Sequence, residues 1–264
     1  MNFHPDSVVF VTGAGGTVGR ATILQFARDG VSKIAGLDIM PEGIAESEKL
    51  LKLEFPNVKF LPIIADLTQI SQVQSAIELT VKEFGRLDHA VNNAGIGQIL
   101  LPTAETSPDE FEKVMNVNLK GVWHCEKYEL EQMMKQDPLP TSVPGRASAR
   151  GTIVNVDSVL GLIAIPNLAI YTMSKHAVLG LTRTDALDYA TKGIRINSIC
   201  PGFIDTPLLT EEKRKGLAPS IAKTPMGRLA TPQEVSDGVV FLSSERSSYI
   251  TGTELKVDGG YCIH

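Results

Sequence analysis

The sequence predicts an α/β fold in which helices cover both faces of a parallel sheet, and three observations indicate it. The chain has 264 residues, 43% of them hydrophobic, which suits one domain with a sizeable core. Short β-branched runs alternate with longer amphipathic stretches, and the first run ends in a glycine-rich turn. Strands and helices that alternate in this way form βαβ units, whose right-handed crossovers give a doubly wound sheet.

The alternation assigns the elements in chain order. We expect strands at 8–11, 34–37, 58–64, 87–91, 151–156, 194–200 and 254–257. We expect helices at about 18–27, 42–53, 71–84, 108–134, 168–190 and 232–242. Repeats and low-complexity tracts are absent from the sequence, so residues 1–264 are expected to form a single domain.

Two segments interrupt this rhythm. Residues 137–150 hold three prolines and two arginines with little apolar content, which is typical of a surface loop. Residues 203–225 hold three prolines around a charged cluster, and they follow the sixth expected strand. We expect this second segment to be a mobile excursion that acts as a substrate lid, with an ordered surface helix as the alternative.

Composition excludes several classes of protein. The net charge of −5 argues against nucleic acid as a partner, because such a ligand needs a basic surface. The cysteines Cys125, Cys200 and Cys262 are odd in number and fit no metal motif, so we expect reduced thiols and no metal. The amino-terminal residues do not resemble a signal peptide, and no apolar run is long enough to cross a bilayer. We therefore expect a cytoplasmic protein without a membrane partner.

The glycine-rich turn predicts a nucleotide site. Residues 8–19 read VVFVTGAGGTVG, a strand, a turn and a helix start, which is the arrangement that binds a pyrophosphate at a helix amino terminus. Asp38 ends the second expected strand, where a carboxylate accepts hydrogen bonds from ribose hydroxyls and repels a 2′-phosphate. This favours NAD over NADP, although Arg20 near the helix start is able to tolerate the phosphate.

A second pattern predicts acid–base chemistry. Tyr171 and Lys175 lie four residues apart at a helix start, so their side chains share one face. A phenol is mostly protonated at neutral pH, and a nearby ammonium favours the phenolate that accepts a proton. Ser158 ends the fifth expected strand, where a hydroxyl can hydrogen-bond a substrate oxygen. The alternatives are a partly buried tyrosine beside an unrelated lysine, and a serine that caps a turn.

These residues together resemble the short-chain dehydrogenase/reductase family, over nearly the whole chain. The family's Thr-Gly-x-x-x-Gly-x-Gly motif reads TGAGGTVG here, with Thr17 in place of the middle glycine. The Thr17 hydroxyl could donate to a phosphate oxygen or cap the helix. The resemblance implies a Rossmann-type fold and a cofactor site made by Gly13, Gly15, Gly16, Thr17, Val18, Gly19, Asp38, Asp66, Leu67, Asn93, Ala94, Gly95, Tyr171, Lys175, Pro201, Gly202, Ile204 and Thr206.

The same resemblance implies a catalytic set of Asn118, Ser158, Tyr171 and Lys175. Tyr171 would exchange a proton with the substrate oxygen, Ser158 would orient that oxygen, and Asn118 would hold a water that relays the proton. The family usually has a small neutral residue where this chain has Asp157, for which the sequence offers no account. The alternative function is a nucleotide-binding protein with a regulatory or non-redox role.

The substrate and the assembly are the last expectations. We expect a hydrophobic secondary alcohol or ketone, because the expected lining is apolar: Ile96, Gln98, Leu100, residues 160–165, Phe203, Leu208, Leu209, Leu217 and Ile221. The expected helices at 108–134 and 168–190 carry small or apolar residues on more than one face, among them Trp123 and Leu181. Members of the family pair through these helices, so we expect a homo-oligomer, a tetramer or a dimer.

Overall fold

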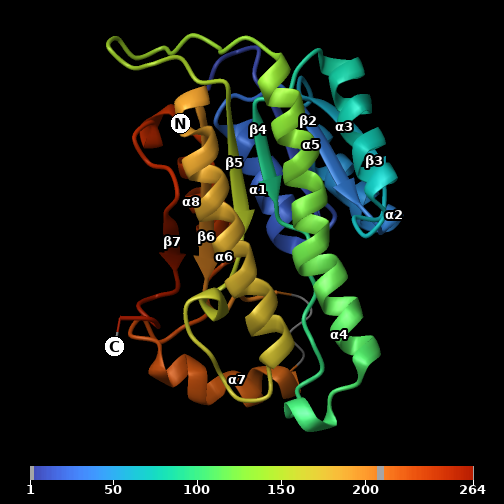
Figure 1. The fold of residues 1–264 in the computed structure, drawn as a ribbon, viewed down its shortest axis with the longest axis vertical. Coiled ribbons are helices and arrows are strands. Elements are labelled where there is room, and N and C mark those ends of the chain that lie inside the picture. Colours follow the sequence, from blue (N-terminus) through green and yellow to red (C-terminus); the bar gives the residue numbers. More distant parts are fainter. Residues whose placement is uncertain (1–2, 207–210, 264) are drawn as a thin grey trace.

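A seven-stranded sheet with strand order β3-β2-β1-β4-β5-β6-β7 forms the centre of the protein, and all its neighbouring strands are parallel (Figure 1). The structure, a computed structural model, describes residues 3–206 and 211–263, without the side chains of 212–214. The strands are β1 (Val8–Thr12), β2 (Lys33–Asp38), β3 (Lys59–Ile64), β4 (His89–Asn92), β5 (Gly151–Val156), β6 (Ile194–Pro201) and β7 (Glu254–Val257). The predicted doubly wound parallel sheet is confirmed.

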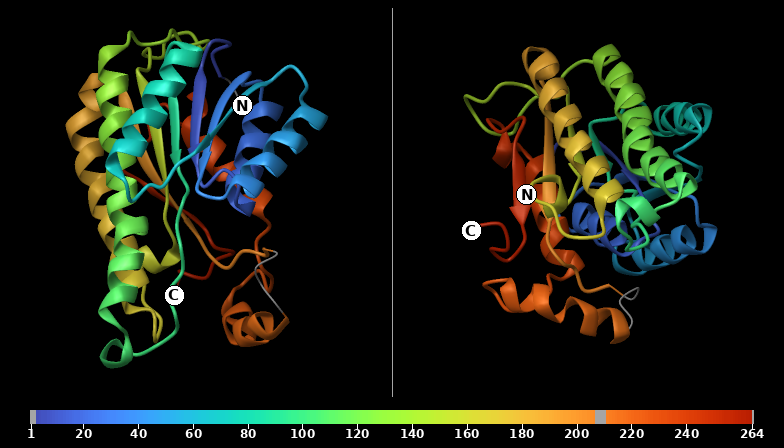
Figure 2. Two further views of the ribbon diagram at one scale, coloured as in Figure 1. Left: turned by 90° about the vertical axis from the view of Figure 1, so that its right-hand side faces the viewer. Right: turned by 60° about the horizontal axis from the view of Figure 1, so that its bottom comes forward.

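Helices cover both faces of this sheet (Figure 2). On one face α1 contacts α2 and α8, and on the other face α3 contacts α5, with α6 beside them. The helices are α1 (Thr17–Arg28), α2 (Pro41–Glu54), α3 (Ile70–Phe84), α4 (Pro108–Met115), α5 (Val122–Lys135), α6 (Ala169–Tyr189), α7 (Glu211–Lys223) and α8 (Pro232–Ser243).

Two apolar clusters, one on each face of the sheet, form the core. Successive strand residues enter opposite clusters: Phe10 and Ile153 pack in one, Val11 and Val154 in the other. This alternation follows from the two-residue period of a strand. Pro62 lies within β3 although proline cannot donate to a ladder, and it is tolerated because β3 is an edge strand and Pro62 is exposed.

The helical stretch predicted for residues 108–134 is continuous but changes its type in the middle. Residues Asn116–Gly121 form a π-helical turn between α4 and α5. Periodicity alone cannot locate such a turn, because its cause is a tertiary contact: the Asn118 side chain accepts a hydrogen bond from the backbone N–H of Ile96 and donates one to the backbone oxygen of Ile96. Turns of this type often occur at functional sites.

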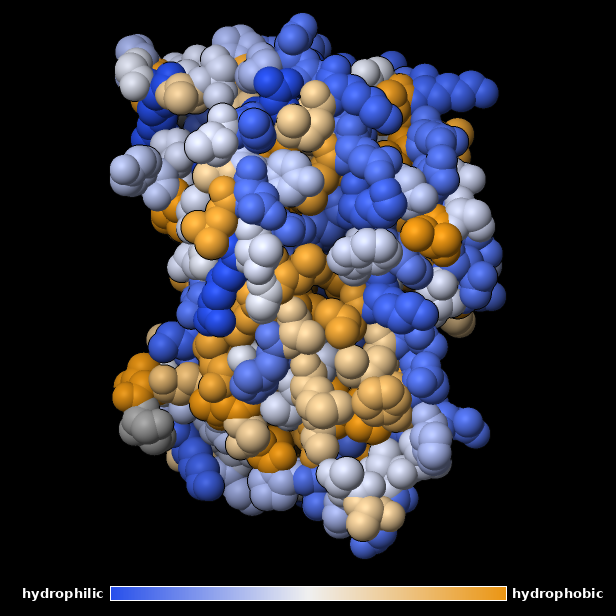
Figure 3. All heavy atoms as spheres, in the orientation of Figure 1, coloured by the Kyte–Doolittle hydropathy of each residue, from blue (hydrophilic) through white to orange (hydrophobic). Residues whose placement is uncertain are grey.

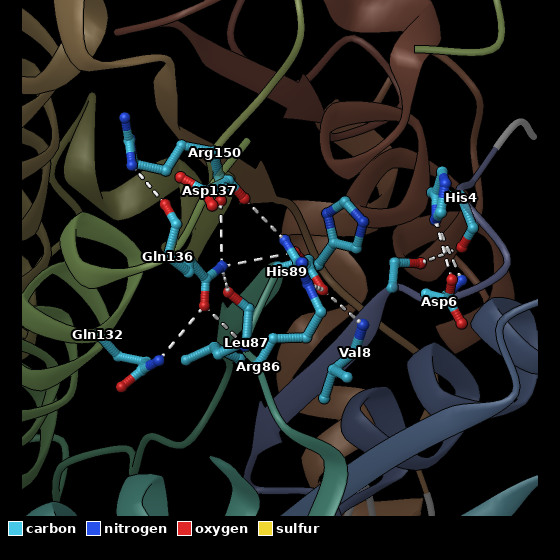
Figure 4. Close-up of polar contacts among 12 residues, drawn as sticks. His4, Asp6, Val8, Arg86, Leu87, His89, Gln132, Gln136, Asp137 and Arg150 are labelled. Atoms are coloured by element: carbon cyan, nitrogen blue, oxygen red, sulfur yellow. Dashed lines mark hydrogen bonds and ion pairs between the residues drawn. The ribbon is translucent and has the colours of Figure 1, made fainter. Parts of the chain in front are cut away.

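The two irregular segments lie at opposite ends of the strands. Residues 137–150 extend beyond the amino ends of the strands as a loop closed by an antiparallel bridge between Leu139 and Ala149 (Figure 1). Gln136 fixes the base of this loop, because its amide exchanges hydrogen bonds with the backbone of Leu87 and donates to the Arg150 oxygen (Figure 4). Arg86 donates to the backbone oxygen of Asp137, which holds the loop's first residue (Figure 4).

The segment predicted as a lid lies beyond the carboxyl ends of the strands, where α7 crosses below the sheet (Figure 1). Its residues Glu211–Lys223 are helical, and Pro219 lies within that helix. The segment is therefore more regular than the prolines suggested, and its movement as a lid stays a prediction. Pro207, Leu208 and Leu209 lie outside the described residues.

Hydrophobic side chains also gather on the surface. Figure 3 shows them on the lower half of the face that carries α5 and α6. The large exposed side chains on the helices of this face include Phe111 on α4, Trp123 on α5 and Met173 on α6. Among the described residues, no helix combines the length and the apolar character needed to cross a membrane.

Candidate active site

Two adjoining hollows open at the carboxyl ends of β1, β4 and β5. The first runs along the glycine-rich turn, and the second lies between α6 and the ends of β5 and β6. Asn93, Gly95, Ile96 and Val18 line both, so the two hollows meet at these residues. The first is lined by Gly13, Gly16, Thr17, Val18, Leu37, Asp38, Ile39, Ala65, Asp66, Leu67, Asn93, Ala94, Gly95, Ile96, Lys113, Val117 and Thr206.

The glycine-rich turn places the start of α1 at the first hollow. Gly13 has a φ of +65°, a left-handed conformation that suits glycine. A side chain at Gly19 would overlap the Gly13 oxygen, so α1 can begin this close to β1 only with glycine there. Gly16 is the N-cap of α1 and offers no side-chain hydrogen bond. The expectation that Thr17 caps the helix is therefore wrong, since Thr17 is the first helical residue, and the helix end stays available to an anion.

Asp38 and Arg20 have different surroundings. The Asp38 carboxylate accepts hydrogen bonds from the N–H groups of Gly15 and Met40, both at 2.9 Å, and lines the first hollow. Gly15 itself does not line it, because it packs against Gly43 of α2. Arg20 donates to the backbone oxygen of Gly15 at 2.9 Å and to the Ser47 hydroxyl at 3.1 Å, so its guanidinium ties the turn to α2.

The ends of β1 and β4 are joined by reciprocal hydrogen bonds. The Thr12 hydroxyl accepts from the N–H groups of Asn93 and Ala94, each at 3.1 Å. The Asn93 amide donates to the backbone oxygens of Thr12 and Gly13. These contacts hold the segment from Asn93 to Gly95 against the glycine-rich turn, which makes both walls of the first hollow rigid.

Asn118 and Lys175 converge on Gly95. A Cβ built on Gly95 would lie 3.4 Å from Asn118 Oδ1 and 4.0 Å from Lys175 Nζ. Asn118 is completely buried and donates from Nδ2 to Ser174 Oγ on α6. Asn118 from the π-helical turn, Lys175 from α6 and Gly95 after β4 thus meet at one point between the two hollows.

Tyr171 and Lys175 lie on the first turns of α6. Lys175 is 4% exposed, its Nζ donates to the backbone oxygen of Val156 at 2.9 Å, and the same Nζ lies 5.8 Å from the centre of the Tyr171 ring. The Tyr171 N–H donates to Gln98 Oε1 at 2.7 Å. Gln98 therefore holds the amino end of α6, a role that no motif in the sequence indicated.

Ser158 lies directly after β5 and begins a short 3-10 turn. Its Oγ accepts from the N–H of Leu160 at 3.1 Å, as in the turn-capping alternative, and the residue also lines the second hollow. Leu168 lines this hollow as well, although the sequence did not single it out. The full lining is Val18, Asn93, Gly95, Ile96, Gly97, Gln98, Val156, Asp157, Ser158, Leu168, Tyr171, Lys175, Pro201, Gly202 and Ile204.

The expected substrate lining is partly wrong. Ile96 and Gln98 line the second hollow, whereas Leu100 is 64% exposed and lies outside it. Phe203 turns away, because its ring packs edge-on against Tyr261 at 5.1 Å between ring centres. Leu160 is buried behind the site. An apolar residue next to a site in sequence can belong to the core, and only the fold distinguishes the two cases.

A buried polar network lies beneath the site, and the sequence did not indicate it. Asn92 donates to Glu129 Oε2 at 3.1 Å and to Asn155 Oδ1 at 3.0 Å, and Asn155 donates to Glu126 Oε2 at 3.1 Å. Burial raises the pKa of Glu129 to about 8 against the opposing hydrogen bond from Asn92, and burial also raises the pKa of Glu126. Asn92 therefore joins β4 to β5 and to α5 within this network.

Comparison with known proteins agrees with this arrangement. A family model described as Enoyl-(Acyl carrier protein) reductase matches residues 13–262. The short-chain dehydrogenase fogB of Aspergillus ruber is 40% identical over 259 residues, which cover 95% of each chain. This chain belongs to the short-chain dehydrogenase/reductase family. As a member of it, the protein has the fold of a family of oxidoreductases.

Solved structures of the family have the same fold. The crystal structure of levodione reductase superposes with a TM-score of 0.88 at 36% identity, covering 97% of each chain. The crystal structure of NAD+-bound xylitol dehydrogenase gives a TM-score of 0.87 at 31% identity, covering 97% of this chain and 98% of that one. A xylitol dehydrogenase with NAD+ bound is thus among the structural relatives.

Proposed function

We propose that this protein is an NAD-dependent oxidoreductase that transfers a hydride between a nicotinamide ring and the carbon of a hydrophobic secondary alcohol or ketone. One observation carries the proposal: the buried Lys175 lies near both the Tyr171 ring and Asn118, beside Gly95, which lines both a nucleotide-sized hollow and a second hollow. A proton-exchanging group beside a cofactor site is the arrangement that hydride transfer requires.

The residues that line the first hollow support the binding of a nicotinamide dinucleotide. The uncapped start of α1 and the backbone at Gly13 and Gly16 would hold the pyrophosphate, and Asp66 and Leu67 would border the adenine. Asp38 would accept hydrogen bonds from the adenosine ribose and disfavour a 2′-phosphate. The other expected residues that line the two hollows are Thr17, Val18, Asn93, Ala94, Gly95, Pro201, Gly202, Ile204 and Thr206, while Gly15 and Gly19 shape the turn.

Each catalytic side chain has a distinct task in the proposal. When bound, the nicotinamide ring supplies the hydride acceptor or donor. Tyr171 takes the proton from the substrate hydroxyl in oxidation and returns it in reduction. The Lys175 ammonium favours the phenolate form of Tyr171, and Ser158 donates a hydrogen bond that orients the substrate oxygen. Asn118, buried beside Lys175, holds the water that passes the proton onward.

The second hollow supports a hydrophobic substrate. Ile96, Leu168 and Ile204 contribute apolar walls around Ser158 and Tyr171. One structural relative is named for reducing levodione and another for dehydrogenating xylitol, so proteins of this fold act in both directions. We further propose that 203–225 closes over the site as a lid. Equal hydrogen exchange in α7 with and without NAD and a substrate analogue would contradict the lid.

We also propose a homo-oligomer, a tetramer or a dimer, assembled through the face that carries α5 and α6. Trp123 and Met173 are each 47% exposed on this face, and exposed apolar patches of this kind mark interaction surfaces. Light scattering that returned the mass of one chain at micromolar concentration would contradict this. Cytoplasmic location is part of the proposal, and fractionation would test it.

Tyr171→Phe tests the main proposal, because it removes the hydroxyl and keeps the ring. We expect turnover of NAD with a panel of secondary alcohols to fall by at least about 100-fold, the usual contribution of a placed acid–base group. NADH binding, measured by nicotinamide fluorescence, should change by less than about threefold. Tyr189→Phe, at the far end of the same helix, is the matched control and should keep full turnover.

The alternative is a protein that binds the nucleotide for a regulatory or non-redox role. NADH binding without turnover of any alcohol or ketone in the panel would favour it. Turnover by Tyr171→Phe equal to that of the unmodified protein would remove Tyr171 from the mechanism.

A further inference from the structure

Asp157 is a buried acid that the proposed mechanism does not use. It lies between β5 and Ser158, is 4% exposed and borders the second hollow. Among the described residues, neither of its carboxylate oxygens has a hydrogen-bond partner. A buried polar group without partners is costly and calls for an explanation, which makes Asp157 the strongest unassigned feature of the site.

The Asp157 side chain occupies space that Gly161 leaves open. A Cβ built on Gly161 would lie 2.9 Å from Oδ1 and 3.0 Å from Oδ2 of Asp157. Asn155, two residues earlier, faces α5 and α6, because its amide donates to Glu126 and Thr182. Strand alternation therefore directs Asp157 toward α6, the helix that carries Lys175.

The charged and titratable groups around Asp157 come from two elements, α6 and β6. On α6, Lys175 and Arg183 attract its carboxylate, but Arg183 also pairs with Glu254 of β7 at 3.1 Å and is exposed. On β6, Cys200 lies close enough for Asp157 to act on it, and burial, followed by Asp157, raises the pKa of this thiol to about 12, so it stays neutral. Lys175 is therefore the buried cation that balances Asp157.

Tyr171 depends on that same cation. Lys175 Nζ lies 5.8 Å from the centre of the Tyr171 ring, and its hydrogen bond to the Val156 oxygen fixes it between the ring and the end of β5. A carboxylate and a phenolate that share one ammonium compete for it, because each negative charge weakens the attraction available to the other.

We propose that Asp157 is a positioning residue that acts through Lys175 and sets the pH at which Tyr171 becomes competent to accept a proton. The proposal rests on the proposed function. When Asp157 is protonated, the whole field of Lys175 favours the Tyr171 phenolate. When Asp157 is ionised, it offsets part of that field, and the phenolate forms only at higher pH.

The titration of Asp157 falls in the range where this matters. Burial raises the pKa of Asp157 to about 7. The Lys175 ammonium, the nearby Ser158 N–H and Arg183 oppose this rise, although the Ser158 N–H does not reach hydrogen-bond geometry. Between about pH 5 and 7 the carboxyl is mostly neutral, and above about pH 7 it is mostly ionised. The rate of alcohol oxidation should therefore rise with pH more gradually than the ionisation of a single group predicts.

Asp157→Asn tests the proposal, because it removes the charge and keeps the shape. We expect the acidic limb of kcat/KM for alcohol oxidation to move down by about 0.5–1 pH unit, with the plateau within about twofold. On the part of the limb above about pH 7, where Asp157 is ionised, this corresponds to a rate about 3- to 10-fold higher, whereas at pH 6, where Asp157 is mostly neutral, the two rates should nearly agree. Asp188→Asn on the exposed side of α6 removes the same charge and should leave the limb unchanged. A limb that stays in place, or moves upward, would overturn the proposal.

A measurement without substrate separates this proposal from the function it rests on. The tyrosinate absorbance of Tyr171 is obtained by subtracting the pH titration of Tyr171→Phe from that of the unmodified protein. In the Asp157→Asn background the same difference should appear at lower pH, whatever the substrate. Asp157→Ser repeats both tests if the Asn variant does not fold. Failure of both variants to fold would show a purely structural role and would also overturn the proposal.

Discussion

Polar groups have opposite surroundings at the two ends of the strands. At the amino ends, the buried Asp88 accepts hydrogen bonds from the Val8 N–H at 2.9 Å, from Arg86 and from Gln136. Gln136 and Arg86 also donate to the loop at 137–150 (Figure 4). At the carboxyl ends, the start of α1 is uncapped and Asp157 has no hydrogen-bond partner among the described residues. The amino ends therefore stabilise the fold, and the carboxyl ends keep polar groups for a ligand.

Asp88→Ala should have the largest effect. A change in catalysis by this variant would contradict the contrast between the two ends of the strands. The change leaves the Val8 N–H and the Arg86 guanidinium without their buried partner, so we expect a loss of about 3 kcal/mol or more in the free energy of unfolding. Turnover of the remaining folded enzyme should stay within about twofold of that of the unmodified protein, because Asp88 lies at the amino ends of the strands, away from the site. Urea unfolding and steady-state kinetics measure the two quantities.

Asp137→Ala is the matched control for Asp88→Ala at the amino ends of the strands. Arg86 binds the backbone oxygen of Asp137 and not its exposed carboxylate, so this substitution keeps the contact. A loss of stability as large as that of Asp88→Ala would mean that general loop disruption, and not the buried acid, explains the effect.

Glu129→Gln should have a moderate effect that depends on pH. The pKa of Glu129 is raised to about 8, so the folded state favours the protonated acid. The stability that this proton provides is complete below the unfolded pKa of about 4.5 and is lost as the pH rises through about 8. Glutamine imitates the protonated form, so we expect Tm to rise by about 3 °C or more at pH 9 and to change by less than about 1 °C at pH 4.5.

Glu131→Gln on the same helix provides the comparison, because Glu131 is exposed and pairs with Lys127. Its Tm difference from the unmodified protein should stay within about 1 °C at both pH values. An equal Tm for Glu129→Gln and the unmodified protein at pH 9 would show that Glu129 is ionised in the folded state without cost.

Asp38→Ala should have the smallest effect. It tests whether a polar group at the carboxyl ends of the strands is kept for the ligand. Removing the carboxylate removes the ribose acceptor and the repulsion of a 2′-phosphate, so the preference for NADH over NADPH should fall by about tenfold. Dissociation constants for both reduced cofactors measure it. A protein that already prefers NADPH would contradict the assignment of Asp38 and transfer the decision to Arg20.

The sequence predicted what depends on local pattern. Apolar runs located the five inner strands because burial on both faces leaves a continuous signal in each of them, whereas the edge strands β3 and β7 are only partly buried. The π-helical turn escaped because its cause, the bond between Asn118 and Ile96, joins residues far apart in the chain. Glu126 and Glu129 escaped because charged residues on a helix are ordinarily assigned to the solvent face, and only the fold shows them buried.

The candidate site divides in the same way. Family motifs contain Tyr171 and Lys175, so their nearness was predictable, whereas Gln98 belongs to no motif and its bond to the Tyr171 N–H exists only in three dimensions. Arg20 also has a role that its position in the sequence did not indicate. Its hydrogen bonds join the glycine-rich turn to α2, and its tolerance of a 2′-phosphate stays a prediction.

The π-helical turn at Asn116–Gly121 constrains how the length of this region can vary in evolution or design. A π turn holds about one residue more than an α turn, so it resets the rotational phase between α4 and α5. Deleting a single residue would join the two helices smoothly but would rotate one relative to the other by about 100°. Either Asn118 or the buried face of α5 would then point the wrong way. Insertions and deletions should therefore be tolerated in the loop at 137–150 and rejected here.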